Sequence, residues 1–131
     1  MKKIFATIML AIILGNGLFA QDIKTTIGMQ FMQVTTIESV MAGGLGRSKM
    51  IVTNADGSQD EEDMENLFSL VGINFKNIRK NEDKIVRTLK TCTDSGWKLE
   101  QTTSLTLSPN DSGSGGIFMT RYLLSKPVEK K

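Results

Sequence analysis

Apolar and polar residues alternate most regularly between residues 97 and 107, and this alternation predicts a strand. The apolar members of the pattern are Trp97, Leu99, Leu105 and Leu107. A period of two places these side chains together on one face and leaves the other face to water. We therefore predict that Trp97 is a core residue shared with these leucines, and that it joins a helix to the sheet.

The returning segment from Ile117 to Ser125 is apolar at both odd and even positions. A strand of this kind is buried on both faces, which predicts a central place in the sheet. Residues 109–116 are rich in Gly, Ser, Asn and Asp, and they predict the hairpin loop between the two strands.

A helical spacing of apolar residues precedes the strand at residue 97. Its members are Ile85, Val86, Leu89 and Cys92. Asn81 is suited to cap the start of this helix, and Gly96 is suited to the left-handed conformation after its end. The sequence therefore predicts a helix from Asn81 to Ser95.

Two further strands are predicted in the first half of the chain, at Met29 to Glu38 and at Ser48 to Thr53, where β-forming residues gather without proline. The turn residues 54–57 end the second of them. A short helix is predicted next, because Ser58 and Glu61 have the spacing of a capping box and carboxylates fill the first turn. The apolar residues at helical spacing are Met64, Leu67, Phe68 and Val71. Residues 73–78 remain open as loop, strand or helix.

Together these elements predict an α+β fold. We expect a small antiparallel-dominated sheet of three to four strands, packed by one main helix, with an extra short helix. The returning strand would lie between the first strand and the Trp97 strand. Since one helix covers one sheet face, the other face needs a cover, and the candidates are the extra helix and a second copy of the chain.

The stretch from Leu89 to Leu99, LKTCTDSGWKL, resembles the helix-to-strand signature of a small bacterial family, domain-of-unknown-function family 4177. Gly96, Trp97 and Leu99 carry the resemblance. It implies a strand, a helix and a hairpin in that order, with residues 40–79 as an insertion relative to the family pattern. The family brings no known catalytic or binding residues to this chain.

The N-terminus has the parts of a secretory signal peptide: Lys2 and Lys3, an apolar run, and small residues up to Ala20. The apolar run is too short to span a membrane. We expect a signal peptide at 1–20 with cleavage near Ala20, a single small domain at 21–131, and a flexible tail at 126–131. The protein would then be exported to the periplasm or secreted, without a membrane span.

The charge balance offers no reason to expect nucleic acid or an anionic membrane as a partner. The chain has 16 Lys and Arg against 14 Asp and Glu, and removal of Lys2 and Lys3 would leave it neutral. An acidic run at residues 60–65 is followed by basic residues between 76 and 90. A solvated charged surface is the default interpretation, and pairing of two helices or of two copies of the chain is the alternative. Cys92 is the only cysteine, so no internal disulfide forms, and its position predicts a buried thiol.

The chain contains no histidine, which removes the usual general base and the Ser-His and Cys-His nucleophile pairs. No cofactor is predicted. A weak calcium loop is suggested by oxygen-bearing residues at EF-hand spacing: Asn54, Asp56, Asp60 and Asp63. Its first ligand position is Val52, which cannot bind a cation, so a turn explains the segment better.

These observations favour a non-enzymatic binding or structural module of the bacterial envelope. Its partner would be another protein or a second copy of the chain, giving a homodimer. Two alternatives remain open: a small-ligand carrier that uses an apolar sheet face, and a histidine-free enzyme.

Overall fold

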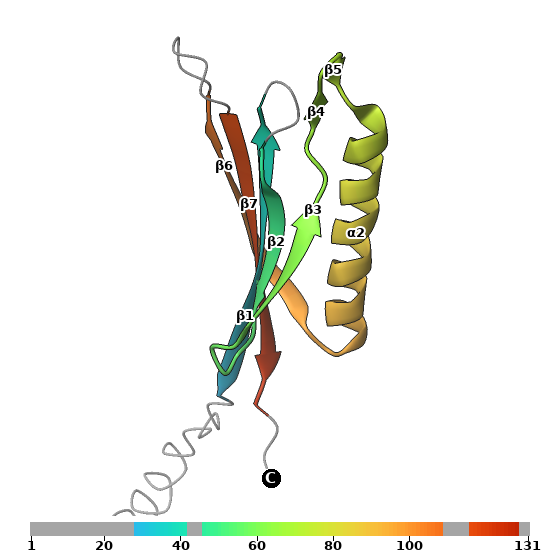
Figure 1. Ribbon diagram of the computed structural model, residues 1–131. Coiled ribbons are helices and arrows are strands. Elements are labelled where there is room, and N and C mark those ends of the chain that lie inside the picture. The colour runs from blue at the N-terminus through green and yellow to red at the C-terminus, as the bar shows by residue number, and fades with distance from the viewer. Residues whose placement is uncertain (1–27, 42–45, 109–115, 129–131) are drawn as a thin grey trace, which may run out of the picture.

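The computed structural model describes residues 28–41, 46–108 and 116–128, and strands dominate it. Its main feature is a five-stranded sheet in the order β3-β2-β1-β7-β6, with a single described helix, α2, along one side (Figure 1). A two-stranded sheet, β4-β5, lies at one end. The elements are β1 (Met29–Val40), β2 (Ser48–Thr53), β3 (Gln59–Met64), β4 (Phe68–Ser69), β5 (Gly72–Ile73), α2 (Phe75–Asp94), β6 (Lys98–Leu107) and β7 (Gly116–Pro127).

The predicted fold class is wrong. Strands make up 56% and helix 22% of the described structure, so the protein is mostly β and not an α+β fold of three to four strands with two helices. The difference arises in the segment between β1 and α2. There the chain forms a hairpin that widens the sheet instead of an extra helix that would cover it.

The predicted short helix is replaced by β3. Asn54 donates its backbone N–H to the Ser58 carbonyl at 2.8 Å, and Gly57 has a φ of 85°, so residues 54–58 reverse the chain. β3 then pairs with β2 along its whole length, from Gln59 opposite Thr53 to Met64 opposite Ser48. The hydrogen-bond ladder to β2 and the ion pairs between β3 carboxylates and lysines stabilise this strand. Together they outweigh the helix start that the capping-box spacing favours locally.

The main helix starts earlier than predicted. Its N-cap is Asn74, whose side chain accepts a hydrogen bond from the Asn77 backbone at 3.2 Å. Asn81, predicted as the cap, lies inside the helix and is 1% exposed. Gly96 has a φ of 86° and follows the helix end, as predicted. The Trp97 N–H then donates to the Cys92 carbonyl at 3.1 Å, which directs the chain into β6.

β7 lies inside the sheet, between β1 and β6, as its two apolar faces predict. It pairs antiparallel with β1 from Met29 opposite Pro127 to Val40 opposite Gly116, and with β6 on its other side. Residues 126 and 127, assigned from sequence to a flexible tail, belong to this strand.

The core lies between the sheet and α2. Its buried apolar residues are Met32, Val34, Met50, Met64, Cys92 and Leu124. Val34 and Leu124 are fully buried, and Ile85, Leu89 and Trp97 pack against this cluster. Cys92 is buried as predicted, and burial raises the pKa of its thiol. Because the thiolate is the reactive form, burial and the raised pKa both disfavour reaction at this cysteine.

A β-bulge in β6 corrects the prediction for its apolar face. Leu99 pairs with Leu124, but Gln101 pairs with Leu123, so Glu100 is an extra residue in the strand. An extra residue reverses the alternation, because cross-strand partners share a face. Trp97 and Leu99 therefore lie on the helix side, and the two later leucines of β6, which were expected beside them, lie on the opposite face.

Several predictions fall on residues outside the described part of the chain. These are the signal peptide at 1–20 and most of the hairpin loop at 109–116. Within the described ranges, no helix is both long enough and apolar enough to cross a membrane.

Candidate functional site

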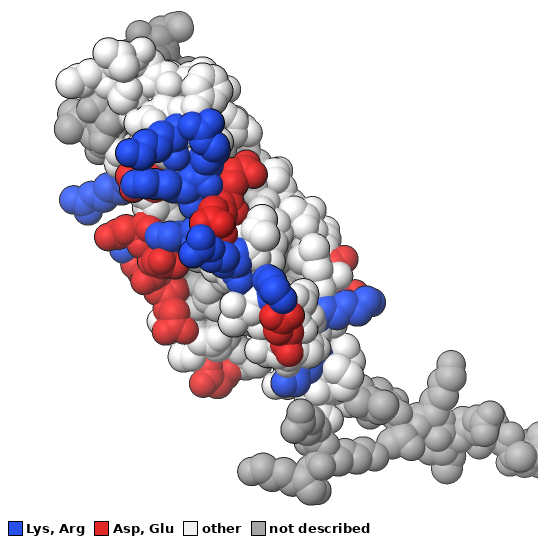
Figure 2. Space-filling view, turned by 90° about the vertical axis from the view of Figure 1, so that its right-hand side faces the viewer, with Lys and Arg blue, Asp and Glu red and all other residues white. Residues whose placement is uncertain are grey.

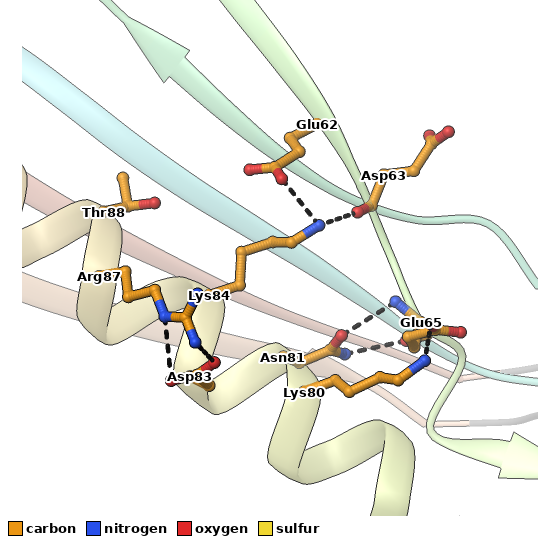
Figure 3. Close-up of a pocket in the computed structure, with 9 residues that line it drawn as sticks. All are labelled: Glu62, Asp63, Glu65, Lys80, Asn81, Asp83, Lys84, Arg87 and Thr88. Atoms are coloured by element: carbon orange, nitrogen blue, oxygen red, sulfur yellow. Dashed lines mark hydrogen bonds and ion pairs between the residues drawn. The ribbon is translucent and has the colours of Figure 1, made fainter.

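A groove of about 420 Å³ runs between β3 and α2, and charged side chains line it (Figure 3). β3 contributes carboxylates and α2 contributes lysines, so the acidic and basic runs of the sequence meet here. The sequence left these charges as a solvated surface, or as a pair between two helices or two copies of the chain. In the structure they pair a strand with a helix.

Each lysine of the groove has a partner on β3 or just after it. The Lys84 ammonium lies 2.9 Å from Glu62 Oε1 and donates to the Asp63 backbone carbonyl at 2.6 Å. The Lys80 ammonium lies 2.7 Å from Glu65 Oε1. The hydrogen bond and positive charge of Lys80 hold the pKa of the Glu65 carboxyl below its ordinary value.

Asn81 is the buried polar residue at the base of the groove. Its side-chain oxygen accepts from the Glu65 N–H at 2.9 Å, and its amide nitrogen donates to the Glu65 carbonyl at 2.9 Å. The same nitrogen donates to Glu38 Oε1 at 3.0 Å. One side chain therefore satisfies both backbone groups of Glu65 and connects α2 to β1 and to the end of β3.

The groove is better suited to holding the fold together than to chemistry. Its lysines are engaged by carboxylates, so none is positioned as a free base or nucleophile. Across the described ranges, no group of three or more histidine, cysteine, aspartate or glutamate side chains could hold a metal ion. The arrangement cross-links α2 to the edge of the sheet.

The calcium candidates are not brought together around a cation. Asn54 donates from its side-chain nitrogen to Asp60 Oδ2 at 3.0 Å. Asp56 accepts from both the backbone N–H and the hydroxyl of Ser58, which lowers the pKa of its carboxyl. Asp63 lies in β3 opposite Lys49, away from this turn. Asn54, Asp56 and Asp60 therefore stabilise the β2–β3 turn.

The sheet face opposite α2, here called the open face, is the second candidate site. Its apolar side chains are Phe31, Ile37, Ile51, Leu105, Leu107, Ile117, Met119 and Leu123. The cross-strand register aligns them in rows, because Ile37 lies opposite Met119 and Met119 lies opposite Leu105. Leu107 and Phe31 are 62% and 52% exposed. None of the described segments lies over this face (Figure 1).

The open face was only partly visible in the sequence. The alternation in β6 indicated one apolar face, but it did not show that the bulge at Glu100 places the later leucines away from the helix. The role of Asn81 was also missed, because its partner Glu38 is 43 residues away in the chain. The one sign of this role in the sequence is that Asn81, a polar residue, lies at the helical spacing of the apolar residues.

No family model, curated protein or solved structure matches this chain. The resemblance through Gly96, Trp97 and Leu99 therefore stays a prediction, and the function has to be argued from the geometry.

Proposed function

We propose that the protein is a non-enzymatic binding module that associates with a second copy of itself through the open face. The observation that carries this proposal is the apolar surface that the widened sheet leaves uncovered on its side away from α2. The predicted extra helix was one candidate cover for this face, and its residues form β3 and the β4–β5 hairpin instead. A second copy is the other candidate.

The size of the face suits a dimer. Its strands contain 12, 12, 10, 6 and 6 residues. At about 3.3 Å per residue and about 4.8 Å between strands, they present a surface on the order of 700 Å². A standard protein interface takes about 800 Å² from each partner. Two such sheets would pack face to face at about 10 Å, as in a β-sandwich.

The charges of the face also fit a copy of itself. Arg121 is exposed between Thr35 and Thr103 in the middle of the face, while Lys49 and Glu61 form an ion pair toward its β3 margin. A two-fold interface brings each patch of one copy against the partner's matching surface, so a face that carries both signs of charge can complement itself.

The alternatives find less support. An enzyme would need an unengaged reactive group, and the lysines of the β3–α2 groove are paired. A small-ligand carrier would need a concave apolar pocket. The groove and a second hollow at the β4–β5 hairpin are lined by none of the apolar side chains of the open face.

Sedimentation equilibrium of the purified protein tests the proposal. We expect a monomer–dimer equilibrium, which Met119→Glu weakens by about 100-fold or more because two carboxylates would be buried against each other. Val86→Glu is the matched control, since Val86 is 62% exposed on the helix. A wild-type chain that stays monomeric at millimolar concentration would overturn the proposal. So would a Met119→Glu variant that dimerises like the wild type.

A further inference from the structure

The β4–β5 hairpin ends in an apolar tip at one end of the molecule (Figure 1). Leu70 and Val71 form its turn and are 89% and 96% exposed, more than any other large apolar residue described. Ile73 and Phe75, just after the turn, are 53% and 65% exposed. Turns of this kind normally carry Gly, Asn, Asp or Ser, so two branched apolar residues at the most exposed positions need an explanation.

The other described hairpin turn shows the usual chemistry. Between β2 and β3 the exposed residues are Ala55, Asp56, Gly57 and Ser58, and the Asp56 carboxylate accepts two hydrogen bonds from Ser58. The apolar composition of the β4–β5 tip is therefore not a general property of the turns in this protein.

The tip is held in place by the elements behind it. Gly72 takes a φ of 108°, and the Ser69 hydroxyl donates to its carbonyl at 3.2 Å. The Asn74 N–H donates to the Leu67 carbonyl at 2.8 Å, which closes the base of the hairpin. The Asn77 side chain donates to the Asn66 carbonyl at 2.8 Å and fastens that base to α2. The apolar side chains are thus presented on a fixed support.

Basic residues flank the tip where α2 begins. Lys76 and Arg79 are exposed, and neither forms an ion pair within the described part of the chain. Glu65, whose carboxylate feels the charge of Lys76, is already paired with Lys80. Figure 2 shows lysine and arginine side chains gathered on the helix side, next to the uncharged end of the molecule.

This combination matches the surface of an anionic membrane. Amphipathic elements at that surface place apolar side chains about 5–10 Å into the boundary and basic side chains among the headgroups. At about 1.5 Å per residue, the helix positions of Lys76 and Arg79 lie within about 6 Å of Phe75 along the axis. The cations therefore stand at headgroup depth when the tip is inserted. Leu70 and Val71, as the two most exposed apolar side chains of a small hairpin turn, fit a lipid surface better than they fit a flat protein face.

We propose that the β4–β5 tip docks the protein on anionic lipid surfaces, with Leu70 and Val71 inserted and Lys76 and Arg79 on the headgroups. Binding through one small tip is weak and reversible, because a single anchor gives only marginal membrane affinity. This site shares no residue with the open face, so the two proposals stand or fall separately.

Co-sedimentation with vesicles tests the docking. Purified protein is mixed with vesicles of phosphatidylcholine alone or of phosphatidylcholine with phosphatidylglycerol. We expect binding to the anionic vesicles that falls as salt rises. Lys76→Gln with Arg79→Gln should lower the partition coefficient by about 25-fold, since each charge near the surface contributes about fivefold. Leu70→Ser with Val71→Ser should lower it at least about tenfold.

The matched control is Val86→Ser with Lys90→Gln, which removes one exposed apolar residue and one basic residue from the middle of the same helix. It should bind vesicles like the wild type. Circular dichroism and thermal unfolding confirm that each variant is folded. The proposal is overturned if the wild type does not sediment with anionic vesicles, or if the tip variants bind as well as the control. Loss of dimerisation in Met119→Glu does not affect this outcome.

Discussion

The two faces of the sheet are built from the same strands, yet only one of them is covered. In β7 the neighbouring residues Leu123 and Leu124 illustrate the contrast. Leu124 is fully buried under α2, whereas Leu123 is half-buried on the open face. Composition does not separate the two faces, because both carry large apolar residues. Their difference comes from where the helix lies, and the open face is therefore the side on which an apolar surface is available for binding.

The largest effect should come from truncation on the covered face. Leu124→Ala removes a fully buried side chain and leaves a cavity, so we expect it to lower the free energy of unfolding by about 3 kcal/mol. Leu123→Ala is the matched control on the open face, and it should cost about 1 kcal/mol or less in the monomer. Urea denaturation at low protein concentration measures both. Equal losses would mean that the two faces are equally buried in solution.

A smaller effect is expected from the polar contact under the helix. Asn81→Ala leaves the backbone N–H and carbonyl of Glu65 without their partner, and it should cost about 2 kcal/mol. Glu82→Ala, the exposed neighbour in the same helix, serves as control and should change stability by less than about 0.5 kcal/mol. The same urea denaturation applies. If both variants lowered the free energy of unfolding by the same small amount, the hydrogen bonds of Asn81 would not stabilise the contact between α2 and the sheet.

The smallest effect concerns the ion pair at the margin of the covered face. The folded-state pKa of Glu65 lies below its ordinary value, so the pair with Lys80 stabilises the fold above about pH 4.5. That contribution is lost as the pH falls through the folded-state pKa. Both side chains are about half exposed, so Glu65→Gln should cost at most about 0.5 kcal/mol at pH 7.

Urea denaturation at neutral pH and near pH 3 measures this difference. The difference in free energy of unfolding between wild type and Glu65→Gln should narrow at the lower pH, because protonation of the wild-type carboxyl removes the charge that pairs with Lys80. A gap that stays constant with pH would show that the carboxylate charge is not its cause. Glu82→Gln provides the control for the removal of one negative charge from this region.

The sequence located most of the strands because their signals are local. The runs that form β1, β2, β6 and β7 were all recognised from β-forming residues or alternation. β3 was missed because Ser58 and Glu61 have the spacing of a helix cap, and local spacing carries no information about the partner strand. In the structure Lys49 of β2 pairs with Glu61, and lysines of α2 compensate the neighbouring carboxylates.

The candidate sites were harder to predict than the strands. The open face depends on the extra residue Glu100, and the pattern gave no sign of it, because the apolar positions before and after the bulge keep the same odd-numbered phase. The β4–β5 tip was hidden for a different reason. Leu67, Phe68 and Val71 fit a helical spacing, so Val71 was assigned to a core although it is almost fully exposed. The basic run between residues 76 and 90 was recognised, but the sequence did not show that Lys80 and Lys84 pair with carboxylates while Lys76 and Arg79 stand beside the tip.

The bulge gives this protein a simple route for evolutionary change. β6 already carries one extra residue at Glu100, and one further residue inserted into the regular ladder between Gln101 and Leu105 would turn Leu105 and Leu107 toward the helix side, with no change in any apolar residue. Deletion of Glu100 would instead leave both leucines on the open face. Insertions and deletions of one residue are common among related proteins, and here one such event would redistribute the apolar surface between the two sides. Relatives of this chain could therefore differ in how they associate while their amino-acid compositions remain almost the same.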